Sequence, residues 1–174
     1  DEHGNEVPHG VQGEEISRGP HMFSGYYKNP EATAKELSDD GWFFSGDLCI
    51  QDETGRVKIN GRKKEILIRG GINISANEVD NNLTGCPGIG AHATIGLPDD
   101  RLGERICTFI VIDGAEEPTL DSIADYLDSI GVAKRLRPEH IEFIDEIPMT
   151  ESGKVKRHQL ADELNRRLQE RANN

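Results

Sequence analysis

The fold is decided most clearly by residues 61–80, which read GRKKEILIRGGINISANEVD. The apolar run in EILIRGG predicts a buried strand that ends at a glycine pair. Ser75 and Glu78 have the spacing of a helix capping box, and Val79 and Leu83 follow it one helical turn apart. This segment therefore predicts a strand, a turn and a short amphipathic helix in succession.

The sequence after this segment continues to alternate strands with helices. Residues 89–98 and 104–112 predict two buried strands, and residues 140–148 predict a third. Thr119 is placed to cap a helix whose predicted apolar face comprises Leu120, Ile123, Leu127 and Ile130. A final helix has an apolar stripe made of Leu160, Leu164 and Leu168. The pattern predicts a compact α+β domain from about residue 64 to the end of the chain.

The sequence before residue 64 has a different character, with many glycines and turn signals. Short strands are predicted within residues 10–20, 22–27 and 41–47. A helix is predicted over residues 30–41, with Pro30 at its start and Gly41 at its end. Such short strands do not easily close a core by themselves, so we expect this region to belong to a larger domain.

Composition excludes several classes of protein. The 174 residues carry a formal net charge of -12, which argues against nucleic acid as a partner. No apolar run is long enough to cross a bilayer, and the first ten residues lack the features of a signal peptide. The three cysteines are dispersed and odd in number, which favours a reducing compartment over a disulfide framework or zinc site. We therefore expect a soluble, cytoplasmic protein without a metal site in this chain.

The basic residues are clustered, so small anions remain suitable ligands despite the acidic balance. The three groups are Arg62, Lys63, Lys64 and Arg69; Lys134, Arg135 and Arg137; and Lys154, Lys156 and Arg157. Taken singly, each group is typical of a solvated surface. In the third group, Gly153 predicts a turn that presents Lys154 just before the last helix. A lysine on such a turn is usually a solvated charge.

Five segments of the chain have a characteristic order and spacing. They are GEEISRGPHMFSGYYKNPEAT, DGWFFSGDL, GRKKEILIRGGINISANEVD, GLPDDRLGER and IPMTESGKVKR. Together they resemble the C-terminal part of an adenylate-forming enzyme, from the superfamily of acyl-CoA synthetases, luciferases and peptide-synthetase adenylation domains. The resemblance covers essentially the whole chain. It implies that residues 64–174 form the mobile α+β C-terminal domain, preceded in residues 1–63 by a β-rich piece of the large AMP-binding domain.

The resemblance also implies a chemistry of two steps. A carboxylate attacks the α-phosphate of ATP and gives an acyl-adenylate and pyrophosphate, and a thiol of CoA then takes the acyl group. The C-terminal domain alternates between the two steps by moving on a hinge. ATP and CoA are thus the implied cofactors, with Mg²⁺ bound mainly by the region that precedes residue 1 in the family. Because that region also supplies the phosphate loop and the acyl pocket, we expect the 174 residues alone to be inactive.

Individual residues match functional positions of the family. Asp47 is implied to hold the ribose hydroxyls of ATP, since a carboxylate accepts two hydrogen bonds at once, and Arg62 to contact the same ribose. Lys64 falls at the hinge. Gly71 lies beside the pantetheine tunnel, where a side chain would block the thiol. Lys154 is implied to reach the α-phosphate and the carboxylate oxygen during adenylation, where a fixed cation stabilises developing charge.

Three functional interpretations remain open at this stage. The first is an AMP-forming acyl-CoA ligase that acts on a cyclic, aromatic or medium-chain carboxylic acid. The second is an aryl-acid adenylating enzyme that loads a carrier protein, and the third is a non-catalytic module that retains the fold. The expected partners are the small-molecule acid, ATP and CoA, with a carrier protein and a homodimer left open. Cys49 follows Asp47-Leu48 where small residues are usual, without a functional explanation.

Overall fold

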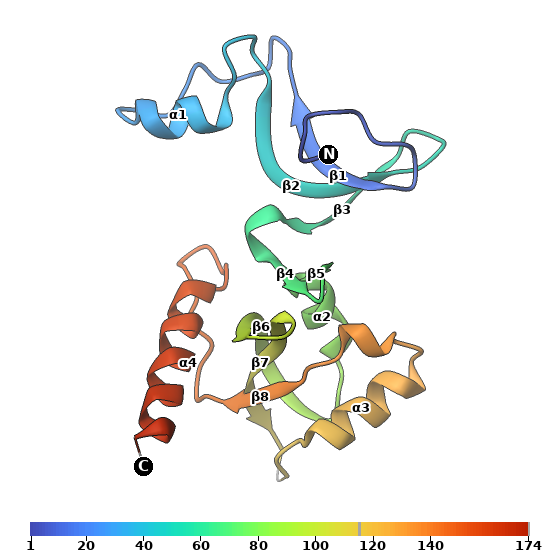
Figure 1. The fold of residues 1–174 in the computed structure, drawn as a ribbon, viewed down its shortest axis with the longest axis vertical. Coiled ribbons are helices and arrows are strands. Elements are labelled where there is room, and N and C mark those ends of the chain that lie inside the picture. Colours follow the sequence, from blue (N-terminus) through green and yellow to red (C-terminus); the bar gives the residue numbers. More distant parts are fainter. Residues whose placement is uncertain (115, 174) are drawn as a thin grey trace. The chain divides into compact units, whose positions relative to one another are not determined.

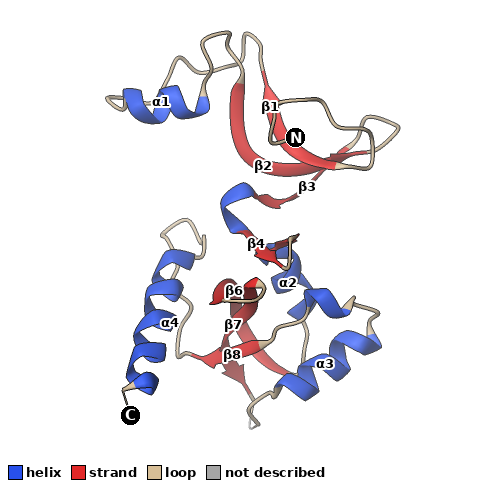
Figure 2. Cartoon of the chain, in the orientation of Figure 1, coloured by secondary structure: helices blue, strands red, loops and turns tan. Residues whose placement is uncertain are grey.

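The computed structural model describes residues 1–114 and 116–173 and divides into two compact units (Figure 1). The N-terminal unit is Asp1–Lys64 and the C-terminal unit is Glu65–Asn174. Both units combine strands with helices, so the predicted α+β class is confirmed (Figure 2). No helix within the described residues has the length and apolar character needed to cross a membrane.

The N-terminal unit is built on an antiparallel sheet of three strands. These strands are β1 (Gln12–Ser17), β2 (Phe43–Gln51) and β3 (Val57–Arg62), in that spatial order. The sequence patterns did not predict β3, in which Val57 and Ile59 are more than half exposed. Pairing with β2, rather than burial of its side chains, defines this strand.

Residues 22–27, predicted as a strand, are not one. Their aromatic side chains pack instead of alternating across a sheet, because the ring of Phe23 meets those of Tyr26 and Phe43 edge to face at 5.0 and 5.3 Å. The backbone N–H of Tyr26 donates to the hydroxyl of Thr33 at 2.9 Å. A side chain thus takes the bond that a neighbouring strand would have made.

Helix α1 (Pro30–Glu36) begins at the predicted proline but ends before the predicted Gly41. The side chain of Asn29 caps its start by accepting a hydrogen bond from Ala32 N. The helix ends early because Leu37 takes an extended conformation and forms an antiparallel bridge with Phe43. Pairing of Leu37 with Phe43 thus overrides the local helix pattern.

The C-terminal unit is built on a sheet of five strands. In spatial order the path is β5 (Ile72–Ser75), β4 (Ile66–Arg69), β7 (Gly103–Asp113) and β6 (Gly88–Asp99), with β8 (His140–Phe143) parallel to β7. The two predicted central strands are confirmed as β6 and β7. The third predicted strand is shorter than expected. EILIRGG forms β4 as predicted, but the partner strand β5, after the glycine pair, was missed.

Two cores lie on opposite faces of this sheet, because alternate residues of β7 point to opposite sides. Ile106 and Ile110 pack under α2 (Ala76–Leu83) and α3 (Leu120–Ser129). Cys107 and Phe109 pack against α4 (Arg157–Ala172) on the other face, so the sheet separates α3 from α4 (Figure 2). The C-terminal unit is therefore a three-layer arrangement of helix, sheet and helix.

The helix caps and apolar stripes of this unit follow the sequence closely, with one exception. Thr119 forms a capping box with Ser122, and the Ser75 hydroxyl accepts a hydrogen bond from Glu78 N at 3.3 Å. In α3, Ile123 and Leu127 are buried as predicted. The prediction was wrong for the other two members of that face, since Leu120 and Ile130 are 38% and 51% exposed. They are the first residue and the C-cap of α3, where the helix begins and ends.

Candidate functional site

Asp47 and Arg62 lie opposite each other on neighbouring strands of the N-terminal unit. They are register partners of β2 and β3, and Arg62 Nε lies 2.8 Å from Asp47 Oδ1. The Asp47 side chain is 30% exposed and that of Arg62 is 56% exposed, so both remain accessible to a ligand. The arrangement places a carboxylate acceptor beside a guanidinium donor, which suits a polar ligand with several hydroxyl groups.

The backbone around Asp47 is shaped by a short hydrogen-bond relay. The Ser45 hydroxyl donates to Glu15 O at 2.8 Å and accepts from Asp47 N at 3.0 Å. Gly46 between them has a φ of +71°, in the left-handed region that favours glycine. Glu14 accepts from Gly46 N and pairs with Lys63. These contacts fix the direction in which Asp47 leaves the sheet.

Lys64 lies in a 3-10 helix, Lys63–Glu65, directly after β3. Its side chain is exposed, and it is the last residue of the N-terminal unit. An exposed residue in a single turn between two units can absorb changes in backbone dihedrals with little loss of packing.

Gly71 lies in the turn between β4 and β5. Gly70 and Gly71 have φ angles of +58° and +78°, so the turn requires left-handed backbone at both positions. Among the described residues beyond its chain neighbours, nothing lies within 4 Å of the position that a Cβ of Gly71 would occupy. Backbone conformation alone therefore explains the glycine, and the space beside it is open.

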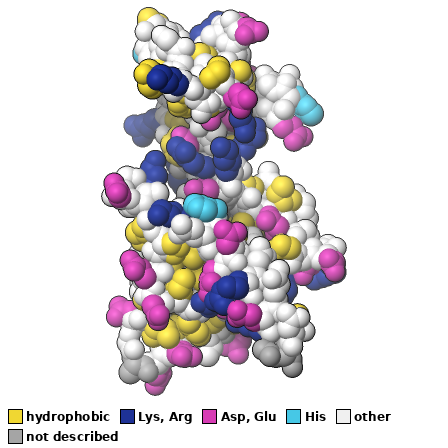
Figure 3. Space-filling model, turned by 90° about the vertical axis from the view of Figure 1, so that its left-hand side faces the viewer, with side chains coloured by type: hydrophobic (Ala, Val, Ile, Leu, Met, Phe, Trp, Pro, Cys, Tyr) yellow, Lys and Arg dark blue, Asp and Glu magenta, His cyan; other side chains and the backbone are white. Residues whose placement is uncertain are grey.

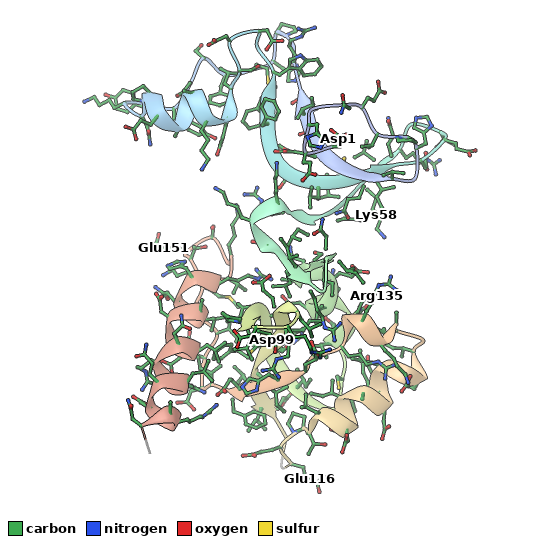
Figure 4. The ribbon with its side chains drawn as sticks, in the orientation of Figure 1. Asp1, Lys58, Asp99, Glu116, Arg135 and Glu151 are labelled. Atoms are coloured by element: carbon green, nitrogen blue, oxygen red, sulfur yellow. The ribbon has the colours of Figure 1, made fainter. Side chains whose placement is uncertain are left out.

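Lys154 lies at the exposed turn that precedes α4. An antiparallel bridge between Met149 and Val155 closes this turn, and Thr150 N donates to Lys154 O at 2.8 Å. The Thr150 hydroxyl accepts from Lys154 N at 3.0 Å. Figure 4 labels Glu151 at the tip of the same turn. Backbone hydrogen bonds thus define the turn and leave the ammonium group of Lys154 projecting from it.

The predicted residues are distributed over both units. The structure brings Asp47 and Arg62 into contact within the N-terminal unit. Gly71 and Lys154 belong to separate loops of the C-terminal unit, with no interaction between them in the described part of the chain.

Ion pairs neutralise much of the clustered basic charge. Arg62 pairs with Asp47, Lys63 with Glu14, Arg69 with Glu139, and Arg137 with Asp128. The face drawn in Figure 3 shows Asp and Glu side chains spread over both units. Within residues 1–114 and 116–173, Lys64, Lys134, Arg135, Lys154 and Lys156 form no ion pair. Lys154 is therefore among the half of the clustered cations whose charge is available to an anionic ligand.

Two polar clusters of the C-terminal unit are not predicted by the sequence. Arg157 contacts α2, β6 and Glu65. Glu142, only 3% exposed, accepts hydrogen bonds from His140, Arg167 and Arg171. Burial opposes the ionised form of Glu142, but these hydrogen bonds outweigh it and lower its pKa to about 2. No sequence spacing signals such contacts, because the partners come from separate elements.

No group of three or more His, Cys, Asp or Glu side chains in the described ranges is placed to hold a metal ion. Cys49, Cys86 and Cys107 are free, and burial raises the pKa of the Cys107 thiol to about 12. A hollow of about 720 Å³ lies in the C-terminal unit and contains none of the predicted site residues. It is lined by Val111, Ile112, Phe143, Ile144, Asp145, Glu163 and Arg167.

Residues 78–154 match the family model described as the AMP-binding enzyme C-terminal domain. The chain is 44% identical over 163 residues to the medium-chain fatty-acid–CoA ligase of Escherichia coli (strain K12), covering 93% of this chain and 29% of that protein. It is 34% identical over 168 residues to the 2,3-dihydroxybenzoate-AMP ligase of Bacillus subtilis (strain 168), covering 97% of this chain and 31% of that protein.

Solved structures agree with these relatives. The crystal structure of ATP-bound MatB from Rhodopseudomonas palustris matches with a TM-score of 0.77 at 36% identity, over 90% of this chain and 31% of that chain. The chain thus spans a little under a third of the length of the proteins it matches. Within that span the motifs, the fold and the family model agree: residues 78–154 form an AMP-binding enzyme C-terminal domain, and the chain is similar over most of its length to part of the adenylate-forming ligases.

Proposed function

We propose that the chain is the C-terminal part of an ATP-dependent acid–thiol ligase and that Lys154 acts in its adenylation step. The observation that carries this proposal is the Lys154 turn, in which backbone hydrogen bonds hold an exposed lysine that has no acidic partner among residues 1–114 and 116–173. The similarity to the adenylate-forming ligases supplies the reaction. In adenylation the acid's carboxylate oxygen bonds to the α-phosphorus while the bond to pyrophosphate breaks. Negative charge grows at these oxygens, and a fixed cation stabilises it more than the ground state.

The other site residues fit supporting roles in this proposal. The paired Asp47 and Arg62 bind the ribose hydroxyls of the nucleotide. Lys64, in its single exposed turn, serves as the hinge on which residues 65–174 move. Gly71 borders the path of the thiol in the second step, in which the thiol sulfur bonds to the acyl carbon and AMP leaves. Residues 1–63 then belong to the large AMP-binding domain, and residues 64–174 to the mobile domain.

The proposed acceptor is CoA and the proposed substrate is a medium-chain or aromatic carboxylic acid. The higher identity to a protein named as a medium-chain fatty-acid–CoA ligase favours this choice. The second candidate is an aryl-acid adenylating enzyme that loads a carrier protein, which the likeness to a 2,3-dihydroxybenzoate-AMP ligase supports. Thioester formation on free CoA, compared with formation on a phosphopantetheinylated carrier protein, separates the two.

The remaining partners follow from the same proposal. Residues outside this chain hold Mg²⁺ with the ATP phosphates, since the described residues offer no metal site. The cytosol is the proposed compartment because ATP and CoA are available there. The 174 residues alone are expected to show no carboxylate-dependent ATP–pyrophosphate exchange above a boiled control. Exchange by this chain would contradict the proposed division of the active site.

The experiment that tests the role of Lys154 measures the two half-reactions separately in the whole ligase. Lys154→Ala should slow acyl-adenylate formation by about 10²–10³-fold, the usual effect of removing one preorganised electrostatic donor. The KM for ATP should change little, because Asp47 and Arg62 still bind the ribose. Given synthetic acyl-adenylate, the same variant should form thioester at nearly the normal rate.

Lys156→Ala is the matched control, because Lys156 is a neighbouring cation that also lacks an ion pair with any described residue. It should leave both half-reactions nearly unchanged. If it slows adenylation as much as Lys154→Ala, bulk positive charge rather than one placed ammonium group is responsible. If Lys154→Ala slows both half-reactions equally, the lysine only maintains the turn. Full activity of Lys154→Ala in adenylation would contradict the proposed role of Lys154, and a lack of adenylation by the unaltered whole protein would favour the non-catalytic module.

A further inference from the structure

Arg157, the first residue of α4, joins four segments of the C-terminal unit through its guanidinium group. Its Nε donates to Thr94 O in β6 at 3.1 Å, and its Nη2 donates to both Asn77 Oδ1 and Asp80 Oδ2 in α2 at 2.7 Å. Its Nη1 lies 3.6 Å from Glu65 Oε1. No other residue of the third basic group, Lys154, Lys156 and Arg157, makes an ion pair in the described part of the chain.

These contacts remove Arg157 from direct contact with substrates. Its side chain is 16% exposed, as is that of Asp80, and two carboxylates, those of Glu65 and Asp80, face its single charge. Desolvation by burial raises the pKa of Asp80, and the neighbouring Arg157 acts in the opposite direction by favouring the ionised form. A guanidinium with all three nitrogens engaged inside the protein serves to hold other groups in place.

Arg157 lies only three residues after Lys154, at the base of the turn that presents the lysine. Within the described residues, the hydrogen bonds of residues 150–154 all stay inside residues 148–156. The position of the turn in the unit is therefore fixed by the contacts of the residues at its base. Ile147 and Val155 pack there against the α4 core, and Arg157 supplies the polar attachment to α2 and β6.

The attachment also reaches the start of the unit. Asn77 Nδ2 donates to Glu65 Oε2 at 2.9 Å, so Glu65 is linked to both Asn77 and Arg157. Glu65 directly follows Lys64, the proposed hinge residue. The base of the Lys154 turn and the first residue after Lys64 are thereby connected through one side chain.

We propose that Arg157 is a positioning residue for adenylation, which rests on the proposed role of Lys154. By clamping the base of the turn to α2, β6 and Glu65, it makes the lysine move as one rigid body with the unit. The ammonium group then arrives at one defined place when the unit closes. A misplacement of about 1 Å at a reacting centre can cost about 10²-fold in rate. Loosening this clamp therefore lowers the adenylation rate while nucleotide binding persists.

The test compares Arg157→Met with Arg137→Met in the whole ligase. Arg137 is a matched control, because its side chain is 13% exposed, pairs with Asp128 and also donates to a backbone carbonyl, Val132 O. Both variants should lose thermal stability. Arg157→Met alone should lower kcat of adenylation about 10- to 100-fold. Its KM for ATP should stay within about threefold, and thioester formation from supplied acyl-adenylate should stay near normal.

Two milder variants keep the test decisive if Arg157→Met does not fold. Asn77→Ala removes one hydrogen bond of Arg157 and also the hydrogen bond from Asn77 to Glu65. It should lower kcat of adenylation by a smaller factor than Arg157→Met does. Arg157→Lys, which keeps the charge but not the three-way contact, should recover part of the rate. Equal kinetic effects of Arg157→Met and Arg137→Met, or equal losses in both half-reactions, would overturn the inference. If Lys154→Ala is slow but Asn77→Ala and Arg157→Met are normal, only the role of Arg157 falls. Normal adenylation by Lys154→Ala would instead remove the proposed role of Lys154, on which the role of Arg157 rests.

Discussion

Gly71 lies in a turn that needs a left-handed backbone, with φ at +78°, and the space beside it is open. Two explanations of this glycine therefore coexist. The turn conformation disfavours any Cβ, whereas the proposed passage of the thiol disfavours only a large side chain. Alanine conflicts only with the left-handed backbone. Leucine conflicts with the backbone and also fills the proposed path of the thiol, so the two substitutions separate the explanations.

In the whole ligase, Gly71→Leu and Gly71→Ala should each cost about 1–2 kcal/mol of stability from the left-handed backbone. Pyrophosphate exchange should remain nearly intact in both. Thioester formation from acyl-adenylate should fall strongly only in Gly71→Leu, because only the larger side chain fills the path of the thiol. Equal thioester rates in the two variants would leave the turn as the sole reason for the glycine.

Glu142 illustrates a buried charge that is stable only with its partners. It accepts hydrogen bonds from Arg171, His140 and Arg167, and its pKa is lowered from 4.5 to about 2. Because the folded pKa lies below the ordinary value, the stabilisation is fully present above about pH 4.5. It is lost progressively as the pH falls towards 2.

Glu142→Gln should therefore lower the free energy of unfolding by about 3 kcal/mol at pH 7, since it leaves cations without their buried partner. The difference from the wild type should shrink between about pH 4.5 and pH 2. Urea titrations at several pH values measure this. Glu163→Gln, which removes a partly exposed partner of the same Arg167, should cost less than about 1 kcal/mol. A pH-independent effect of Glu142→Gln would contradict the assignment.

At the scale of the secondary-structure elements, α3 shows how contact with a sheet selects among apolar residues. The helix covers the face of the sheet formed by Ile106 and Ile110, and there it buries Ile123 and Leu127. Leu120 has the same helical periodicity but is 38% exposed. Leu120, at the N-terminal end of the helix, thus lies partly at the surface, although the sequence pattern assigns it to the core.

Leu127→Ala should destabilise the chain by about 2–5 kcal/mol, because it opens a cavity in a packed core. Leu120→Ala is the matched control with the same side chain on the same helix. It should cost less than about 1 kcal/mol, because little apolar area becomes newly exposed. Chemical denaturation of the two variants measures both values. Similar losses would show that Leu120 is covered in the folded protein.

At the scale of the whole chain, the polypeptide passes from one compact unit to the other through a single turn with two exposed lysines. The boundary after Lys64 falls within the 3-10 helix, Lys63–Glu65, at which trypsin can cut beside either of two lysines. Segments with few buried contacts open locally at low free energy. Residues 65–174 form their own sheet and supply the hydrophobic core on each of its two faces.

Limited trypsin digestion should therefore cut first after Lys63 or Lys64 and leave the C-terminal unit as a resistant fragment. Mass spectrometry identifies the cut, and thermal unfolding of the fragment should be cooperative. A chain with Arg62→Gln, Lys63→Gln and Lys64→Gln is the control and should lose this cleavage, because trypsin also cuts after arginine. A resistant fragment that retains the first sixty residues but lacks α4 would contradict the proposed autonomy of the C-terminal unit.

The sequence by itself determined those elements whose signals lie close together along the chain. The β6 and β7 strands, the caps of α2 and α3 and the buried stripe of α4 follow from periodicity and capping residues. The resemblance to the family followed from five motifs in order. Short-range hydrogen bonds and alternating burial need only neighbouring residues, which explains why these features were predictable.

Only the tertiary structure decided which residues meet across the sheets and helices. The short strands β3 and β5 exist because a neighbouring strand completes their hydrogen bonds, although their own patterns are weak. The pairing of Asp47 with Arg62, and the contacts of Arg157 with α2 and β6, likewise depend on strand register and helix packing. Such contacts form only once segments far apart in the sequence have closed around a common core, so no local pattern specifies them.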